Sequence, residues 1–388
     1  MSTPLVARMQ PFGRSIFAEM TRRALEFDAV NLGQGFPDSE PVPELREVVH
    51  AAIEGGTNQY APGRGMPVLR EAVAEHQGRF YGLDLDPGSE VLVTVGATEA
   101  LTASILAFVE EGQEVLTFDP SFDIYRSAVA LAGGVHRTVP LRFPRWDFSA
   151  SELADAVNDR TRLIVLNNPH NPTGKVFTDS ELRTIAEIAI AHDLIVITDE
   201  VYEHLVYEGV HRPMATLPGM RERTLTISSG GKTFSATGWK VGWATGPAAL
   251  VKAVATVKQG LTFTASGPFQ PAIAHGLLLD DSFFTGLAES MAARRDVMVT
   301  AFAGSAMSVA PCSGGYFVVA DVAGLGVRDA VQFCWDLPER IGVVGVPVSA
   351  FCSDPALAPT LVRLAICKQE AVLREGARRL GTLGRAAG

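Results

Sequence analysis

The sequence predicts an α/β protein, in which a mostly parallel sheet covered by helices is followed by a smaller α+β unit. Between about residues 90 and 260, short apolar segments alternate with amphipathic segments, as strands alternate with helices in such folds. Most of the short segments are β-branched and lack a polar alternation, which is typical of strands buried on both faces. Beyond Pro268 this regular alternation ends.

Seven segments are expected to form the strands of the sheet. They lie at residues 91–95, 115–118, 136–141, 163–166, 194–198, 224–228 and 241–245. Between them, helices are expected at 99–109 and 179–191. The second of these begins with a capping-box pattern formed by Thr178 and Glu181.

The sequence of the last part of the chain predicts that it forms the smaller α+β unit. A helix is expected over residues 282–302, a strand pair interrupted by two glycines over 312–322, and a basic helix over 370–380. The first forty residues are too few for a domain of their own, so we expect them to join one of the two larger units.

Composition excludes several classes of protein. Of the 388 residues 47% are apolar and 20% charged, which suits a globular protein with a large core and is unlike a disordered or fibrous chain. The 43 acidic residues outnumber the 33 basic ones, so no nucleic-acid partner is expected. No apolar stretch approaches the roughly 18 residues of a membrane-spanning helix, so no membrane association is expected.

The cysteines do not form a metal-binding pattern. Cys312, Cys334, Cys352 and Cys367 are separated by 22, 18 and 15 residues, without a CxxC pair or a nearby pair of histidines. We therefore expect no metal site. Buried thiols of this kind are typical of a reducing compartment, and we expect a cytoplasmic protein.

Small and polar residues follow four of the expected strands. Ligands of open α/β sheets bind at the carboxyl ends of strands, so these residues are the candidates for a functional site. The first segment opens a helix with small residues and would hold an anion on backbone N–H groups. The four segments are GATE at 96–99, NNPHNPTGK at 167–175, DEVY at 199–202 and SGGKT at 229–233.

Two nucleotide-binding interpretations fail on their spacing. Gly231-Lys232-Thr233 follows a strand, as in a P-loop, but the first glycine of that motif would stand at position 226, which is threonine. Gly63-Arg64-Gly65 lacks the third glycine of a dinucleotide-binding motif.

Five motifs in a fixed order resemble one family over almost the whole chain. They are NLGQGFPD at 31–38, NNPHNPTGK at 167–175, TDEVYEHL at 198–205, SSGGKTFSATGWKVGW at 228–243 and Val362-Arg363-Leu364. They are similar to the motifs of the fold type I, pyridoxal-phosphate-dependent aminotransferases of class I/II. Within that family they resemble equally the kynurenine aminotransferase/glutamine transaminase K branch and the bacterial N-succinyldiaminopimelate aminotransferases.

The resemblance implies the complete fold. Residues 44–277 would form a large domain with a mostly parallel seven-stranded sheet covered by helices. Residues 1–43 and 278–388 would form a smaller α+β domain from both chain ends.

The resemblance also implies pyridoxal 5′-phosphate as the cofactor. Lys232 matches the lysine that binds it covalently, and Asp199 matches the carboxylate that faces the pyridine nitrogen. Tyr202 and Asn171 match the pair that hydrogen-bonds the phenolic oxygen of the ring, and Phe122 matches the aromatic residue that stacks on it.

Further residues are implied for the cofactor phosphate. Ala97, Thr98, Ser229 and Lys240 match its binding set. Lys240 stands where the aspartate aminotransferases have arginine, which favours the branch named above. Tyr60 resembles the tyrosine that reaches the phosphate of the neighbouring subunit, which implies a homodimer with shared active sites.

Substrate binding is implied for three residues. Arg363 matches the arginine that binds the substrate α-carboxylate, for which its planar fork is suited. Gly35 matches the backbone partner of the same carboxylate, and Asn171 is the third residue implied for substrate binding. Residues 264–267 lack the aromatic residue and the histidine that kynurenine-type enzymes have there, which leaves room for a longer or more polar side chain.

The implied function is a PLP-dependent aminotransferase that works by a ping-pong mechanism. It would move an amino group from an amino acid, such as N-succinyl-diaminopimelate, to a 2-oxo acid such as 2-oxoglutarate, with Lys232 also serving as the base. The alternative is a kynurenine/glutamine/methionine-type aminotransferase with cysteine-conjugate β-lyase activity. A transcriptional regulator is not expected, because the motifs begin at Asn31 and a DNA-binding domain needs roughly 60 residues ahead of them.

Overall fold

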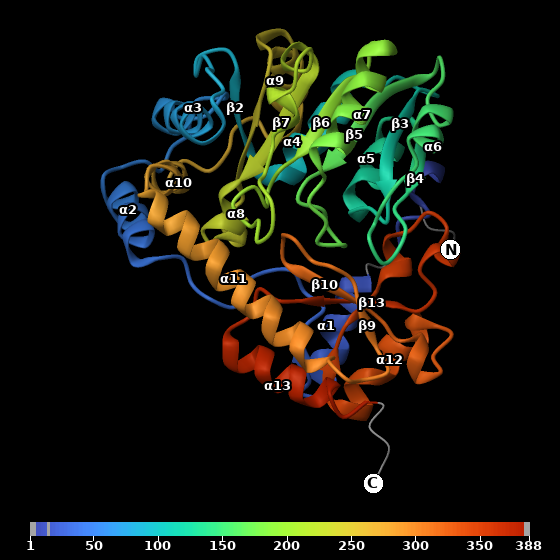
Figure 1. Ribbon diagram of the computed structural model, residues 1–388. Helices are drawn as coiled ribbons and strands as arrows, with labels where there is room; N and C mark the ends of the chain where they lie inside the picture. The colour runs from blue at the N-terminus through green and yellow to red at the C-terminus, as the bar shows by residue number, and fades with distance from the viewer. Residues whose placement is uncertain (1–4, 14–15, 384–388) are drawn as a thin grey trace.

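The computed structural model describes residues 5–13 and 16–383. Residues 1–4, 14–15 and 384–388, all within the expected small domain, lie outside the described residues. Figure 1 shows a larger upper part that contains a sheet and, below it, a smaller unit of orange and red elements together with blue elements from the start of the chain.

A seven-stranded sheet forms the centre of the larger part, in the order β2-β8-β7-β6-β5-β3-β4. Strand β8 runs antiparallel to both of its neighbours, and the other neighbouring pairs are parallel. The mostly parallel seven-stranded sheet is therefore confirmed. The strands are β2 (Val91–Val95), β3 (Glu114–Asp119), β4 (Val135–Pro140), β5 (Thr161–Asn167), β6 (Ile195–Asp199), β7 (Thr224–Ser229) and β8 (Val241–Thr245).

Burial differs between the strands of the sheet. Strands β3 and β6 are buried at every residue, whereas β4 alternates between more and less exposed residues. Both β2 and β4 are edge strands, but β2 is buried at four of its five residues, so helices cover that edge of the sheet more completely than the edge at β4.

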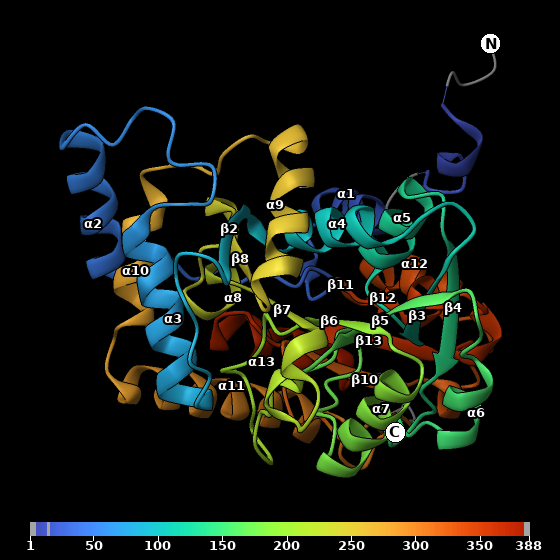
Figure 2. The same cartoon turned by 90° about the horizontal axis from the view of Figure 1, so that it is seen from above.

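Helices cover both faces of the sheet (Figure 2). On β5, Leu163 and Val165 pack with α4, α5 and α9, while Ile164 and Leu166 pack with α6 and α7 on the other face. Thr178 and Glu181 form the expected capping box at the start of α7. The helices of this part are α2 (Pro43–Glu54), α3 (Pro67–Tyr81), α4 (Gly96–Phe108), α5 (Asp123–Leu131), α6 (Ala150–Asp155), α7 (Asp179–Ala191), α8 (Gly230–Thr233), α9 (Ala248–Leu261) and α10 (Phe269–Leu277).

The smaller unit combines both ends of the chain, as expected. Its antiparallel sheet has the order β12-β13-β10-β9, and β1 near the N-terminus pairs in parallel with β11. The strands are β1 (Val30–Asn31), β9 (Ser308–Val309), β10 (Phe317–Asp321), β11 (Val343–Val344), β12 (Val346–Pro347) and β13 (Leu361–Ala365). The helices are α1 (Ile16–Glu26), α11 (Asp281–Ala301), α12 (Ala330–Ile341) and α13 (Glu370–Leu380).

The prediction of a strand pair over residues 312–322 is wrong. Only β10 forms there, and its partners are β9 and β13. The two glycines instead lie against the loops that follow β5 and β6: Gly314 N–H donates to the carbonyl of Gly174 (3.0 Å), and Gly315 N–H donates to that of Leu205 (2.8 Å). A Cβ at Gly314 would lie 2.7 Å from the Leu205 carbonyl oxygen, so this close backbone approach requires glycine.

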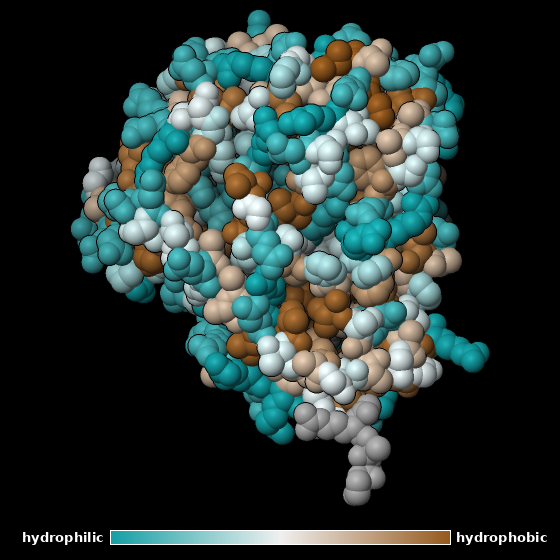
Figure 3. Space-filling view, viewed as in Figure 1, coloured by the Kyte–Doolittle hydropathy of each residue, from teal (hydrophilic) through white to brown (hydrophobic). Residues whose placement is uncertain are grey.

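Two features of the surface bear on the expected partners. Among the described residues, no helix is long and apolar enough to span a bilayer. Figure 3 shows a mostly hydrophilic face with small apolar patches, several of them near the middle, where the larger part meets the smaller unit.

Candidate active site

The carboxyl ends of the central strands border a cavity of about 380 Å³. Strands β5, β6 and β7 are parallel and in register, with Asn167 paired to Asp199 and Asp199 to Ile227, so the residues after them meet at one edge. All of the expected site residues except Tyr60 line this cavity. They are Gly35, Ala97, Thr98, Phe122, Asn171, Asp199, Tyr202, Ser229, Lys232, Lys240 and Arg363.

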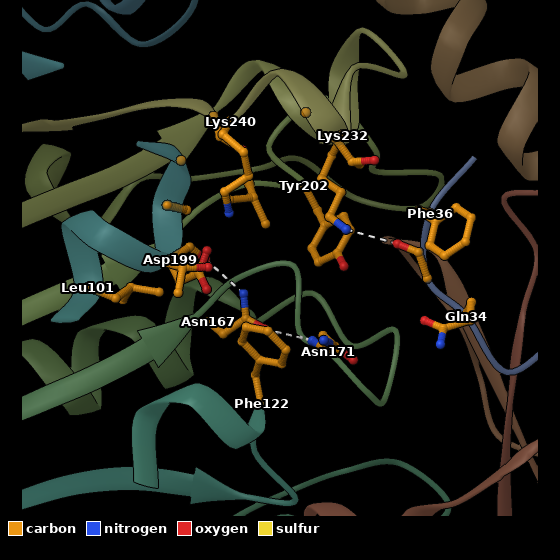
Figure 4. Close-up of a pocket in the computed structure, with 18 of the residues that line it drawn as sticks. Gln34, Phe36, Leu101, Phe122, Asn167, Asn171, Asp199, Tyr202, Lys232 and Lys240 are labelled. Carbon is orange, nitrogen blue, oxygen red and sulfur yellow. Dashed lines mark hydrogen bonds between the residues drawn. The ribbon is translucent and has the colours of Figure 1, made fainter. Parts of the chain in front are cut away.

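Lys232 lies in α8, directly after β7, with its amine in the cavity (Figure 4). Its Nζ donates to the carbonyl oxygen of Gly35 at 2.8 Å and lies 5.8 Å from the centroid of the Tyr202 ring. Burial lowers the pKa of this amine, against the opposing charge of Asp199. An amine with a lowered pKa has a larger neutral fraction, which is the form that attacks a carbonyl or accepts a proton.

Asp199 is the last residue of β6 and has one unpartnered carboxylate oxygen. Its Oδ2 accepts a hydrogen bond from the Tyr125 hydroxyl at 2.7 Å, whereas Oδ1 is buried without a partner among the described residues. Burial raises the pKa of this carboxyl to about 6, although the Tyr125 hydrogen bond and the charge of Lys232 act in the opposite direction. An orphaned buried oxygen of this kind fits a donor on a group bound in the cavity.

Asn167 and Asn171 connect the loop after β5 to Asp199. The side-chain amide of Asn167 donates to the backbone carbonyl of Asp199 at 2.8 Å, and its oxygen accepts from the backbone N–H of Asn171 at 2.6 Å. Both bonds are drawn in Figure 4, which shows the Phe122 ring on the opposite side of the opening from Lys240 and Lys232.

Arg363 enters the cavity from β13 of the smaller unit. Its guanidinium donates to Asn171 Oδ1 (3.0 Å) and to the Gly33 carbonyl (2.8 Å), and its Nε is buried with no partner in the described part of the chain. Its Cζ lies 3.9 Å from the centroid of Phe317, 4.5 Å from that of Phe351 and 5.2 Å from that of Phe17. Burial lowers the pKa of Arg363 to about 10, so the group stays cationic at neutral pH.

The start of α4 forms a corner suited to an anion. Ala97 and Thr98 lie in its first turn, where backbone N–H groups have no partner within the helix. A Cβ on Gly96 would lie 3.1 Å from Lys240 Nζ, which places this ammonium against the same turn. Ser229 supplies a hydroxyl at the end of β7. Ammonium, hydroxyl and backbone N–H donors together fit a phosphate group.

Comparison with known proteins gives the family of the chain. Residues 28–380 match the family described as "Aminotransferase class I and II". The chain belongs to this aminotransferase family. The enzyme therefore catalyses the transfer of an amino group, and members of its family generally use PLP.

Individual relatives of the aminotransferase agree with this. It is 47% identical over 390 residues to the "Probable N-succinyldiaminopimelate aminotransferase DapC" of Mycobacterium tuberculosis H37Rv, covering 97% of this chain and 98% of that protein. It is 38% identical over 385 residues to the methionine aminotransferase of Escherichia coli K12, covering 98% and 100%. The solved structure of the Mycobacterium tuberculosis N-succinyldiaminopimelate aminotransferase matches with a TM-score of 0.95 over 98% of this chain and 100% of that chain.

Tyr60 of the aminotransferase lies outside the cavity of its own chain. Its side chain is 83% exposed, and its ring meets that of Phe263 edge-to-face at 5.4 Å. Phe263 is 49% exposed and has a φ of +66°, which is uncommon for an aromatic residue. The buried Lys258 donates to the carbonyl oxygens of Gly63 (3.1 Å) and Phe263 (3.2 Å), which ties together the two loops that carry this aromatic pair.

Sequence reasoning missed several residues around the aminotransferase site. Tyr125 contacts Asp199, Tyr316 donates from its hydroxyl to the Lys232 carbonyl at 2.5 Å, and Phe317 and Phe17 flank Arg363. Tyr125 stands three positions after the expected site residue Phe122, but nothing in the sequence near it indicates its contact with Asp199.

Proposed function

We propose that this aminotransferase binds pyridoxal 5′-phosphate in the cavity and moves an amino group from an amino acid to a 2-oxo acid by a ping-pong mechanism. The observation that carries the proposal is the meeting of three groups in one cavity. They are the amine of Lys232, an unpartnered carboxylate oxygen of Asp199 and the guanidinium of Arg363. When bound, the cofactor supplies an electron-withdrawing ring that stabilises negative charge at the substrate Cα.

Lys232 holds the cofactor and then moves a proton. Its amine lies in a buried position that lowers its pKa and so increases the fraction that is neutral, the form that can accept the proton of the substrate Cα and later give a proton back. The Gly35 carbonyl, 2.8 Å away, keeps the amine on the side of the N-terminal segment until it reacts.

Asp199, Tyr202, Asn171 and Phe122 orient the ring of the cofactor. Asp199 offers its free oxygen to the ring nitrogen, and Tyr202 and Asn171 offer hydrogen-bonding groups to the phenolic oxygen. Phe122 offers the flat apolar face on which the ring can stack. Ala97, Thr98, Ser229 and Lys240 hold the phosphate at the start of α4.

Arg363 binds the substrate α-carboxylate. Its planar guanidinium lies among three aromatic rings, which limit its rotation and exclude water from around it. Gly35 and Asn171 border the same part of the cavity and complete the binding of this carboxylate.

We further propose a cytoplasmic homodimer in which Tyr60 reaches the phosphate of the partner's cofactor. The exposed Tyr60–Phe263 pair supports this, because two exposed aromatic rings side by side are typical of a contact surface. The four cysteines are free and buried, which fits a reducing cytoplasm.

The amino donor is the least constrained part of the proposal. N-succinyl-diaminopimelate is the first candidate, because the relative with that printed activity is 47% identical. Within the described residues, however, the only cations lining the cavity are Lys232, Lys240 and Arg363, and each already has a role. No other described residue that lines it is a cation able to bind a distal carboxylate, and Phe17, Phe36 and Phe317 line it with apolar surface. This observation favours the second candidate, a methionine-, glutamine- or kynurenine-type enzyme with β-lyase activity toward cysteine conjugates.

A half-reaction screen tests the function and separates the two candidates. The holoenzyme is mixed with N-succinyl-diaminopimelate, methionine, glutamine, kynurenine or a cysteine conjugate, and the absorbance of the lysine-bound cofactor is followed. A donor should remove that absorbance, and 2-oxoglutarate should restore it. Release of pyruvate and ammonia from the cysteine conjugate without an oxo acid would identify the β-lyase activity. If no amino acid changes the absorbance, the proposed function is wrong.

A further inference from the structure

Tyr125 contacts two of the residues proposed to hold the cofactor, although it does not line the cavity itself. Its side chain is only 2% exposed, and it lies in the first turn of α5. Its hydroxyl donates to Asp199 Oδ2 at 2.7 Å, and its ring meets the Phe122 ring edge-to-face at 5.9 Å.

The hydrogen bond from Tyr125 engages one carboxylate oxygen of Asp199 and leaves the other available. Oδ2 accepts the bond from Tyr125, whereas Oδ1 is buried and has no partner within residues 5–13 and 16–383. Asn167 binds the backbone carbonyl of Asp199 and leaves its carboxylate free. A rotation of the carboxylate out of its present plane would break the bond to Tyr125, so this bond holds that plane and leaves the other oxygen facing a ligand.

The same bond weakens the attraction of Asp199 for a proton. A donor to a carboxylate stabilises its ionised form, and burial of Asp199 acts in the opposite direction. A ring nitrogen and a carboxylate that face each other share one proton. If the carboxylate binds protons more weakly, the proton resides more on the nitrogen.

We propose that Tyr125 is a positioning residue that directs Oδ1 of Asp199 toward the cofactor ring and keeps the shared proton on the ring nitrogen. The inference rests on the proposed function, because it requires the cofactor to lie with its ring nitrogen at Asp199. It assigns to Tyr125 a role in the electronic state of the cofactor, which a tyrosine that only fills space would not have.

The test removes the hydroxyl of Tyr125 and keeps its aromatic ring. Tyr125→Phe preserves the contact with Phe122 and removes only the donor. Holoenzyme is prepared with ¹⁵N-labelled pyridoxal 5′-phosphate, and the chemical shift of its ring nitrogen is measured. We expect a protonated nitrogen in the wild type and a shift toward the unprotonated position in the variant. We also expect the dissociation constant of the cofactor to rise about tenfold.

Tyr207→Phe is the matched control. Tyr207 is a partly buried tyrosine, its hydroxyl donates to the Gly315 carbonyl, and it does not line the cavity. In the Tyr207→Phe enzyme, the ring-nitrogen signal of the cofactor should equal that of the wild type. Should Tyr125→Phe fail to fold, 3-fluorotyrosine at position 125 keeps the ring and strengthens the donor. The nitrogen should then stay at least as protonated as in the wild type.

The outcomes separate the inference from the proposed function. If borohydride reduction leaves no pyridoxyl group on Lys232, the proposed site is wrong. If the pyridoxyl group is on Lys232 but the wild-type ring nitrogen is unprotonated, the role assigned to Tyr125 is wrong and the proposed function stands. If the wild-type nitrogen is protonated and Tyr125→Phe leaves its signal unchanged, the role of Tyr125 alone is wrong. A shift of that signal toward the unprotonated position in the fluorotyrosine enzyme would also overturn it.

Discussion

The guanidinium of Arg363 lies 3.9 Å above the ring of Phe317. The two residues lie on neighbouring antiparallel strands, β13 and β10, and the same Phe317 ring lies so close to Gly35 that a Cβ at that glycine would overlap it. Gly35 therefore has a steric reason to be glycine, in addition to the carbonyl that it offers to Lys232. One aromatic ring thus positions both the arginine and the N-terminal segment that borders the cavity.

Replacing Arg363 with lysine should lower kcat/KM for every amino acid substrate. Arg363→Lys keeps a positive charge but loses the planar fork and the contact with Phe317. We expect the transition state to lose about 2 kcal/mol or more of stabilisation, measured as a lower kcat/KM. Steady-state kinetics with acidic, neutral and aromatic amino acids measure this. A loss confined to acidic substrates would place Arg363 at the substrate side chain instead.

Removing the carboxylate of Asp199 should separate cofactor attachment from catalysis. In Asp199→Ala, borohydride reduction should still find part of the cofactor on Lys232, whereas removal of the Cα proton should slow by several orders of magnitude, because the ring nitrogen loses its ionic partner. Stopped-flow kinetics of the half-reaction with Cα-deuterated substrate measure that step. A rate within tenfold of the wild type would contradict the role of Asp199.

Mixing two inactive variants should restore activity if Tyr60 acts on the partner subunit. A Lys232→Ala chain and a Tyr60→Ala chain are exchanged to form hybrid dimers, in which one site carries both lesions and the other carries none. Random mixing then restores roughly a quarter of all sites. If Tyr60 serves its own chain, every hybrid site carries one lesion. An absence of activity in confirmed hybrids would therefore exclude the shared site.

The buried His76 and the partly buried His204 should make the fold less stable in mild acid. His76 Nε2 and His204 Nε2 lie 2.6 Å apart and share one hydrogen bond, which requires a neutral ring as acceptor. Burial lowers the pKa of His76 to about 3 and that of His204 to about 2, and the nearby charge of Arg79 adds to this. Since an unfolded histidine titrates near 6.5, the unfolded chain binds more protons below that pH. Stability is thus fully present above about pH 6.5 and falls as the pH decreases toward the folded values.

The measurement is the free energy of unfolding of wild type and His204→Gln between pH 5 and 8. The wild type should lose about 1 kcal/mol more than the variant on going from pH 7.5 to 5.5. His50→Gln, at an exposed position on α2, should follow the wild type. Equal pH dependence in wild type and His204→Gln would show that this pair does not titrate on unfolding.

The sequence by itself determined the features that depend on neighbouring residues. Apolar segments without alternation predicted the strands, and the cap formed by Thr178 and Glu181 predicted the start of α7. The residues after β5, β6 and β7 could be assigned to one cavity because parallel strands in register end at the same edge of a sheet. The resemblance of the motifs then indicated which of them belong to one chemistry.

Only the tertiary structure decided which distant residues touch. Residues 312–322 have the composition of a strand pair, but β10 pairs with β9 and β13, and the adjoining glycines pack on the loops of the larger part. Tyr125 and Asp199 are 74 positions apart, and nothing near either residue specifies the other. Phe17 and Phe317 reach Arg363 from different elements of the smaller unit. Such contacts arise from the packing of whole elements against one another, and the free energy of that packing is not a property of any local segment.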